Sequence, residues 1–95
     1  MRQYQITCVT EPDRISRHEH ITHVGNPAVN WRITREEGIR LTEGRVHELF
    51  TIDLRTGARS FVGVVRELRK SSYLRTYADG LWNDSLLALT ECSLA

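Results

Sequence analysis

The 95-residue sequence lacks any long hydrophobic run. No stretch approaches the roughly 20 apolar residues that a membrane-spanning helix needs, and the opening residues MRQYQITC hold no apolar core of a signal peptide. We therefore expect a cytoplasmic protein without membrane contact. A composition that is 40% hydrophobic and 26% charged is typical of a folded globular chain. Because this length suits one hydrophobic core, the prediction is a single domain over residues 1–95.

The chain also has little net charge and little lysine. Its 13 basic and 12 acidic residues give a formal charge of +1, and Lys70 is the only lysine. This balance excludes a global positive field that would attract nucleic acid or anionic lipid, so electrostatic recognition must be local. The arginines suit phosphate and carboxylate partners, but a genomic preference for arginine codons is the simpler explanation of their number.

Only two cysteines are present, Cys8 and Cys92, near opposite ends of the chain. Without an export signal, free thiols are expected rather than a disulfide. The two residues could still meet if both ends of the chain pack together.

One helix has clear boundary signals. Thr34 followed by Glu37 forms a capping box, so the helix should begin at Arg35 and run for about nine residues. Gly44 is placed to end it in a left-handed conformation. Gly38 in its middle costs about 1 kcal/mol relative to alanine, so tertiary packing must support the helix.

The remaining pattern predicts strands and turns. Alternating residues predict a strand from Tyr4 to Val9, and residues 10–30 read as an irregular segment with at most a short strand near residues 21–24. Residues 46–52 and 59–66 form a predicted hairpin around Thr56-Gly57, residues 73–77 another strand, Asp79-Gly80 a tight turn, and residues from 83, 84 or 85 to 89 a short final helix. The expected fold is α+β in the order β-α-β-β-β-α: a three- to four-stranded antiparallel sheet, one packed helix and a short C-terminal helix.

Several short motifs together resemble a known family. They are Ile6-Thr7-Cys8-Val9, Asp13-Arg14, the run from His18 to Gly25, Trp31, Glu36-Glu37, Tyr73-Leu74-Arg75-Thr76, Ala78-Asp79-Gly80, Leu86-Leu87 and Glu91-Cys92. With these residues the chain resembles a family of short bacterial proteins catalogued only as a domain of unknown function, over nearly its whole length. The chain departs from that pattern at Asn26, Gly38, Ser85 and Thr90. The resemblance implies a bacterial, one-domain, cytoplasmic protein and carries no activity, cofactor or catalytic residue.

The long polar segment from Asp13 to Gly25 is the first candidate site, because long irregular segments are often functional. Signatures of phosphate-binding loops, serine hydrolases and metalloproteases are absent from the sequence, which favours a non-enzymatic binding or adaptor module. The partner would be a protein or a small anionic ligand. Its contacts are expected from Arg14, His18, His23, Arg75 and Asp79.

The histidines also allow a metal or thiol site. His18, His20 and His23 fall within six positions, and Cys8 and Cys92 could add sulfur ligands for zinc. The H-x-H-x2-H spacing matches no strong zinc signature, so no cofactor is expected and zinc stays a minor alternative. A histidine beside Cys8 would activate its thiol, as in a thiol- or metal-dependent hydrolase, but a buried cysteine in the core is the simpler explanation.

A third hypothesis is nucleic-acid binding by the hairpin between Arg55 and Arg75. This segment holds six basic residues and one acid, Glu67, and Tyr73, Arg75 and Tyr77 share a strand face. Aromatic rings beside guanidinium groups can stack bases and hold phosphate. The residues concerned are Arg59, Arg66, Arg69, Lys70 and Tyr73. Trp31 and Trp82, in contrast, are expected to be core anchors.

Overall fold

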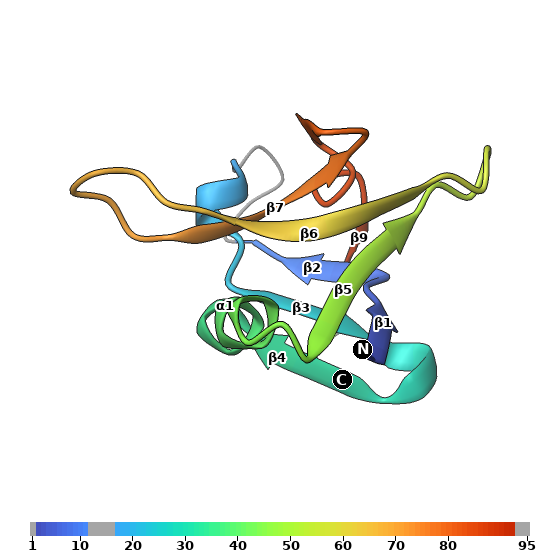
Figure 1. Ribbon diagram of the computed structural model, residues 1–95. Coiled ribbons are helices and arrows are strands. Elements are labelled where there is room, and N and C mark those ends of the chain that lie inside the picture. The colour runs from blue at the N-terminus through green and yellow to red at the C-terminus, as the bar shows by residue number, and fades with distance from the viewer. Residues whose placement is uncertain (1, 12–16, 93–95) are drawn as a thin grey trace.

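A computed structural model describes residues 2–11 and 17–92, which fold into two β-sheets, one α-helix and two 3-10 helices (Figure 1). The strands are β1 (Arg2–Gln5), β2 (Cys8–Thr10), β3 (His23–Asn26), β4 (Trp31–Thr34), β5 (His47–Ile52), β6 (Arg59–Val65), β7 (Tyr73–Ala78), β8 (Leu81–Asn83) and β9 (Thr90–Glu91). The helices are η1 (His18–His20), η2 (Pro27–Val29) and α1 (Arg35–Glu43).

The two sheets have five and four strands. The order is β1-β5-β6-β7-β8 in the larger sheet and β4-β3-β2-β9 in the smaller one. The α+β class is confirmed, but the prediction of one antiparallel sheet with three to four strands is wrong. Two pairs are parallel, β1 with β5 and β2 with β9, and they join segments far apart in the sequence. Local alternation cannot reveal such pairs.

The predicted first strand is divided between the two sheets. The Ile6 N–H donates to the Phe50 carbonyl at 2.8 Å, within the larger sheet, whereas the Thr7 N–H donates to the Gly25 carbonyl at 2.9 Å, within the smaller sheet. The chain therefore crosses from one sheet to the other between Ile6 and Thr7. The segment predicted as irregular, residues 10–30, contains η1, β3 and η2, and β3 begins within the short strand that was allowed near residues 21–24 but ends two residues later.

The predicted hairpin around Gly57 and the predicted tight turn at Asp79-Gly80 are confirmed, and the turn leads into β8, a strand that the sequence pattern did not predict. Strands β5 and β6 pair antiparallel around a turn in which Gly57 has a φ of 75°. Strands β7 and β8 are joined by Asp79 and Gly80, both left-handed with φ of 54° and 78°. Such a two-residue turn has the twist that a tight hairpin requires.

The predicted helix α1 is confirmed over nine residues, with its capping box in place. The Glu37 N–H donates to the Thr34 hydroxyl at 3.1 Å, and the Thr34 N–H donates to the Glu37 carboxylate at 3.2 Å. Gly44 does not end the helix in the predicted left-handed conformation: its φ is −70°, and Arg45, at 59°, makes that turn. The helix packs so closely that a Cβ atom at Gly38 would lie 2.9 Å from Leu74 Cδ1.

The core lies between the two sheets and contacts α1. Its buried residues are Ile6, Val9, Ile21, Val24, Leu49, Val62, Leu74 and Leu86.

The predicted final helix is wrong, because residues 85–88 form only turns before β9. Asn83 does accept the Ser85 N–H at 3.0 Å, but the Leu86 N–H bonds to the Thr76 hydroxyl at 3.2 Å. Burial of Leu86 against the larger sheet therefore sets the path of this segment in place of a helix.

Candidate functional site

Two residues of the first predicted site, His18 and Arg75, both lie beside Asp84, a residue that the sequence pattern did not indicate. Arg75 Nη2 lies 3.1 Å from Asp84 Oδ1, and His18 Nε2 lies 3.8 Å from the same oxygen. Arg75 also donates to the Asn83 carbonyl at 3.3 Å. His18 is buried, and its Nε2 has no hydrogen-bond partner among the described residues. Burial lowers the pKa of His18, and the neighbouring Arg75 charge lowers it further, while Asp84 and Glu19 act in the opposite direction.

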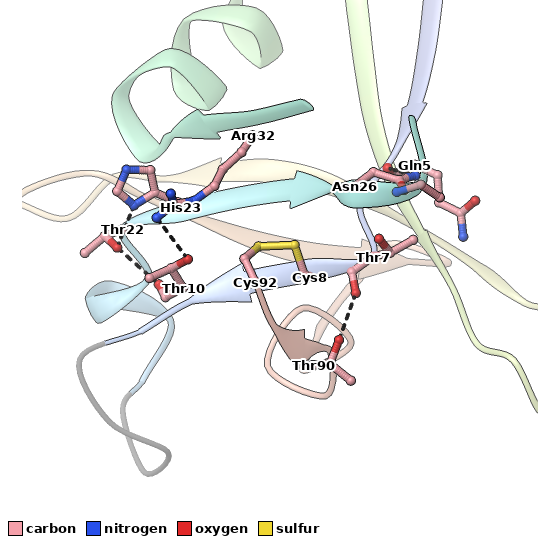
Figure 2. Close-up of a disulfide and its surroundings, with 11 residues drawn as sticks. Gln5, Thr7, Cys8, Thr10, Thr22, His23, Asn26, Arg32, Thr90 and Cys92 are labelled. Atoms are coloured by element: carbon pink, nitrogen blue, oxygen red, sulfur yellow. Dashed lines mark hydrogen bonds between the residues drawn. A yellow bond between two sulfur atoms is a disulfide. The ribbon is translucent and has the colours of Figure 1, made fainter. Parts of the chain in front are cut away.

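The other predicted contacts do not join this cluster. His23 lies on β3, where its Nδ1 is 3.0 Å from the Thr22 hydroxyl (Figure 2). Asp79 is exposed in the β7–β8 turn. Arg14, and with it Asp13, lies outside the described residues. Of the predicted contacts that lie within the described residues, only His18 and Arg75 come together, and they do so through Asp84.

The two cysteines form a disulfide, so the expectation of free thiols is wrong. Cys8 on β2 and Cys92 after β9 are bonded to each other across 84 positions of sequence (Figure 2). The parallel pairing of β2 with β9 brings them together, and the Cys92 N–H donates to the Val9 carbonyl at 2.9 Å. A disulfide sulfur is neither a thiolate nucleophile nor a thiolate metal ligand.

The predicted metal set is not assembled either. His18 is buried beside Asp84, His20 is exposed on η1, and His23 bonds to Thr22. Among residues 2–11 and 17–92, no group of three or more His, Cys, Asp or Glu side chains is arranged to hold a metal ion. Proximity in sequence failed as a guide because η1 and β3 direct the three imidazoles to different surroundings.

Most basic residues of the predicted nucleic-acid segment have acidic partners. Arg66 bonds to Glu43, Lys70 lies 3.2 Å from Glu67, and Arg55 lies 3.8 Å from Asp53. The local excess of positive charge is therefore largely offset by neighbouring carboxylates. Two arginines of this segment, Arg59 and Arg69, have no acidic partner among the described residues. Arg59 lies over the Phe50 ring at 4.7 Å and bonds to Gln3 at 3.5 Å.

Tyr73 was predicted to stack on nucleic-acid bases, which requires an exposed ring, but the structure buries it. It is only 7% exposed, and its hydroxyl donates to Glu67 at 3.1 Å. Burial raises the pKa of Tyr73, and the hydrogen bond to Glu67 raises it further. The bonds from Lys70 and Tyr73 lower the pKa of the Glu67 carboxyl. Tyr73 is thus engaged within the protein rather than free to stack on a base.

The larger sheet carries a row of aromatic residues that runs across four strands. Phe50, Phe61, Tyr77 and Trp82 are successive partners in register on β5, β6, β7 and β8. Their ring centroids are 6.5, 6.5 and 5.9 Å apart along the row. They lie on the face opposite the core, since their chain neighbours Leu49, Val62 and Thr76 point inward and are buried.

The exposed end of this row lies on the edge strand β8. Tyr77 is 39% exposed, Trp82 47% and Leu81 73%, whereas Phe50 at the other end is 8% exposed. The Trp82 ring leans over β6, where a Cβ atom at Gly63 would lie 3.0 Å from its Cη2. We call Tyr77 and Trp82 the β8 patch; Leu81 precedes Trp82 on the strand and therefore points to the opposite face. Trp82 was expected in the core, and the structure instead places it on the surface.

One local signal could have found this patch. A two-residue turn at Asp79-Gly80 fixes the hairpin register, which sets Trp82 opposite Tyr77. The pairing of Tyr77 with Phe61, however, depends on how β7 adds to the β5–β6 hairpin. That tertiary contact is not written in the spacing of the sequence.

Comparison with known proteins identifies a family for this chain. The family model described as "Protein of unknown function (DUF3892)" matches residues 5–90. No curated protein and no solved structure matches the chain. Within the described residues, no helix is long and apolar enough to cross a membrane. Because the match spans most of the sequence, as the earlier resemblance indicated, the chain belongs to the DUF3892 family.

Proposed function

We propose that this protein is a non-enzymatic binding module that takes an extended segment of a partner protein along strand β8. The observation that carries the proposal is the β8 patch: Trp82 on the edge strand β8 and Tyr77 beside it on β7 are both exposed, and Leu81, also exposed, lies on the other face of the same edge strand. Natural proteins usually protect such edges with charges, prolines or covering segments. Large apolar side chains at an edge instead favour a docked partner.

The physical basis is strand addition. The outer strand β8 pairs only with β7 among the described residues, so its other side offers main-chain hydrogen-bonding groups to an added strand. Tyr and Trp are the residue types that most often dominate binding energy at protein interfaces. Asp84 directly follows β8 and forms an ion pair with Arg75 of β7, which adds charged groups close to the end of the edge strand.

The proposal is tested by selecting peptides from a random display library on the wild-type protein. Selected peptides are then titrated against Trp82→Ala and against a control, Leu68→Ala, whose side chain is 90% exposed outside the patch. Loss of a hot-spot residue costs about 2 kcal/mol, or about 30-fold in affinity. Wild-type binders should lose this affinity in Trp82→Ala, keep it in Leu68→Ala, and shift the amide signals of β8. Peptides that bind both variants equally would refute the proposal.

A second candidate is single-stranded nucleic acid, favoured by the same exposed rings, on which bases can stack. The cations without acidic partners, Arg59 and Arg69, would supply the phosphate contacts, since Arg66 and Lys70 are paired. Two neutralised phosphates predict a slope of about −1.4 for the logarithm of affinity against that of salt concentration. Fluorescence anisotropy with oligo(dT) measures this slope, and absence of binding at low salt would exclude the candidate.

A further inference from the structure

A separate cavity of about 280 Å³ lies between edge strands of the two sheets and is also bordered by α1. Figure 1 shows the arrangement of these strands. The strands concerned are β1 of the larger sheet and β4 of the smaller one. The cavity is lined by Tyr4, Trp31, Ile33, Leu41, His47 and Leu49. Tyr4 and Leu49 are partners in register on the core face of the larger sheet, so this site is distinct from the β8 patch on the opposite face.

Half of the lining is aromatic. The Tyr4 ring meets the Trp31 ring edge to face, with centroids 6.3 Å apart and planes at 74°. On its other side Tyr4 lies beside the His47 ring, at 5.6 Å and 31°. The remaining lining is aliphatic and comes from both sheets and the helix. Such walls favour a planar, apolar molecule that can contact ring faces and edges.

The aromatic rings also carry unused polar atoms. Among the described residues, the Tyr4 hydroxyl, Trp31 Nε1 and the His47 ring nitrogens have no hydrogen bond to the protein. Apolar walls with a few convergent polar groups are the usual composition of a small-molecule site. A cavity of about 150 Å³ is sufficient for benzene. The larger volume here accommodates a bicyclic ring.

We propose that this cavity binds a planar bicyclic aromatic molecule that carries one hydrogen-bonding group. The rings of Tyr4, Trp31 and His47 contact its faces and edges, and their polar atoms bond its substituent. This inference does not depend on the β8 patch, because the two sites lie on opposite faces of the larger sheet.

The two tryptophans provide the measurement. Each gives one indole N–H signal in a nitrogen-15 correlation spectrum, assigned with Trp82→Phe. Titration with 2-naphthol should shift the Trp31 signal saturably and leave the Trp82 signal in place, because Trp82 lies on the outer face. Equal shifts of both signals, or no saturable shift of Trp31, would overturn the proposal. Cyclohexanol should bind at least tenfold more weakly, and equal binding would overturn the aromatic class.

Matched variants test the location. Leu41→Phe extends a larger side chain into the cavity and should weaken 2-naphthol binding at least tenfold. Leu68→Phe makes the same change at an exposed position and should bind as the wild type does. If Leu41→Phe does not fold, Ile33→Phe fills the cavity from β4 and carries the same expectation. A folded cavity-filling variant that retains wild-type affinity would contradict the assignment.

Discussion

Reduction of the Cys8–Cys92 disulfide should strongly destabilise the protein. The bond closes a loop of 84 positions, and the loss of chain entropy in the unfolded state scales with the logarithm of that length. For this loop the effect is about 4.5 kcal/mol. A domain of this size has a total stability of roughly 5–14 kcal/mol, so the bond contributes a third of it or more. The bond also links Cys8 on β2 to Cys92 directly after β9, and both residues are buried. Its reduction should therefore loosen the pairing of β9 with β2.

The assay is thermal unfolding followed by circular dichroism, with and without a phosphine reductant. Each kcal/mol lowers the melting temperature of a domain this small by about 4–8 °C, so the reduced protein should melt roughly 20–35 °C lower. Mass spectrometry after alkylation identifies the state of the cysteines in each sample. The double variant Cys8→Ala/Cys92→Ala serves as control and should melt low regardless of reductant.

Two results would refute this reasoning. Two alkylated cysteines in the untreated protein would show that the bond does not form in solution. A fully reduced protein whose melting temperature falls by less than about 5 °C would show that the loop contributes little, contrary to the chain-entropy argument.

Three further predictions concern the helix and the buried histidine. Gly38→Ala gains about 1 kcal/mol of helix propensity, but its new methyl group would lie 2.9 Å from Leu74 Cδ1, and such overpacking costs about 1–3 kcal/mol. The free energy of unfolding should therefore fall by about 1 kcal/mol in urea unfolding, and a stabilised variant would contradict the packing. Thr34→Ala removes the N-cap and should cost about 1 kcal/mol in the same assay, whereas Thr34→Ser should restore most of it. Because burial and Arg75 lower the pKa of His18, its neutral form favours the folded state: stability should be full above the ordinary value of 6.5 and fall as the pH drops below it. His18→Gln should flatten that slope in unfolding measured from pH 8 to 5, and an unchanged slope would assign the effect to other groups.

The arginine-rich segment shows how a charge count can mislead. Its six basic residues and single acid suggested a nucleic-acid surface. The structure brings Glu43 from α1 to Arg66, and Asp84 to Arg75. Both carboxylates come from outside the segment and offset its positive charge. A count along the chain cannot include partners that folding brings from elsewhere.

Several features followed from the sequence alone because their causes are local. The capping box between Thr34 and Glu37 fixed the start of α1, and Asp79-Gly80 indicated the tight turn that follows β7. Family membership also followed from short motifs. Each of these depends on residues a few positions apart, where backbone geometry and side-chain hydrogen bonds suffice.

The features on which the two proposals rest, and the disulfide, were decided by the tertiary structure. The Cys8–Cys92 bond, the parallel pair β1 with β5, the aromatic row ending at Trp82 and the cavity between β1 and β4 all join distant segments. Sequence periodicity reports which side of a strand is apolar, but not which strand lies beside it or which sheet it joins. Those choices are set by burial of one shared core, which depends on all the segments at once.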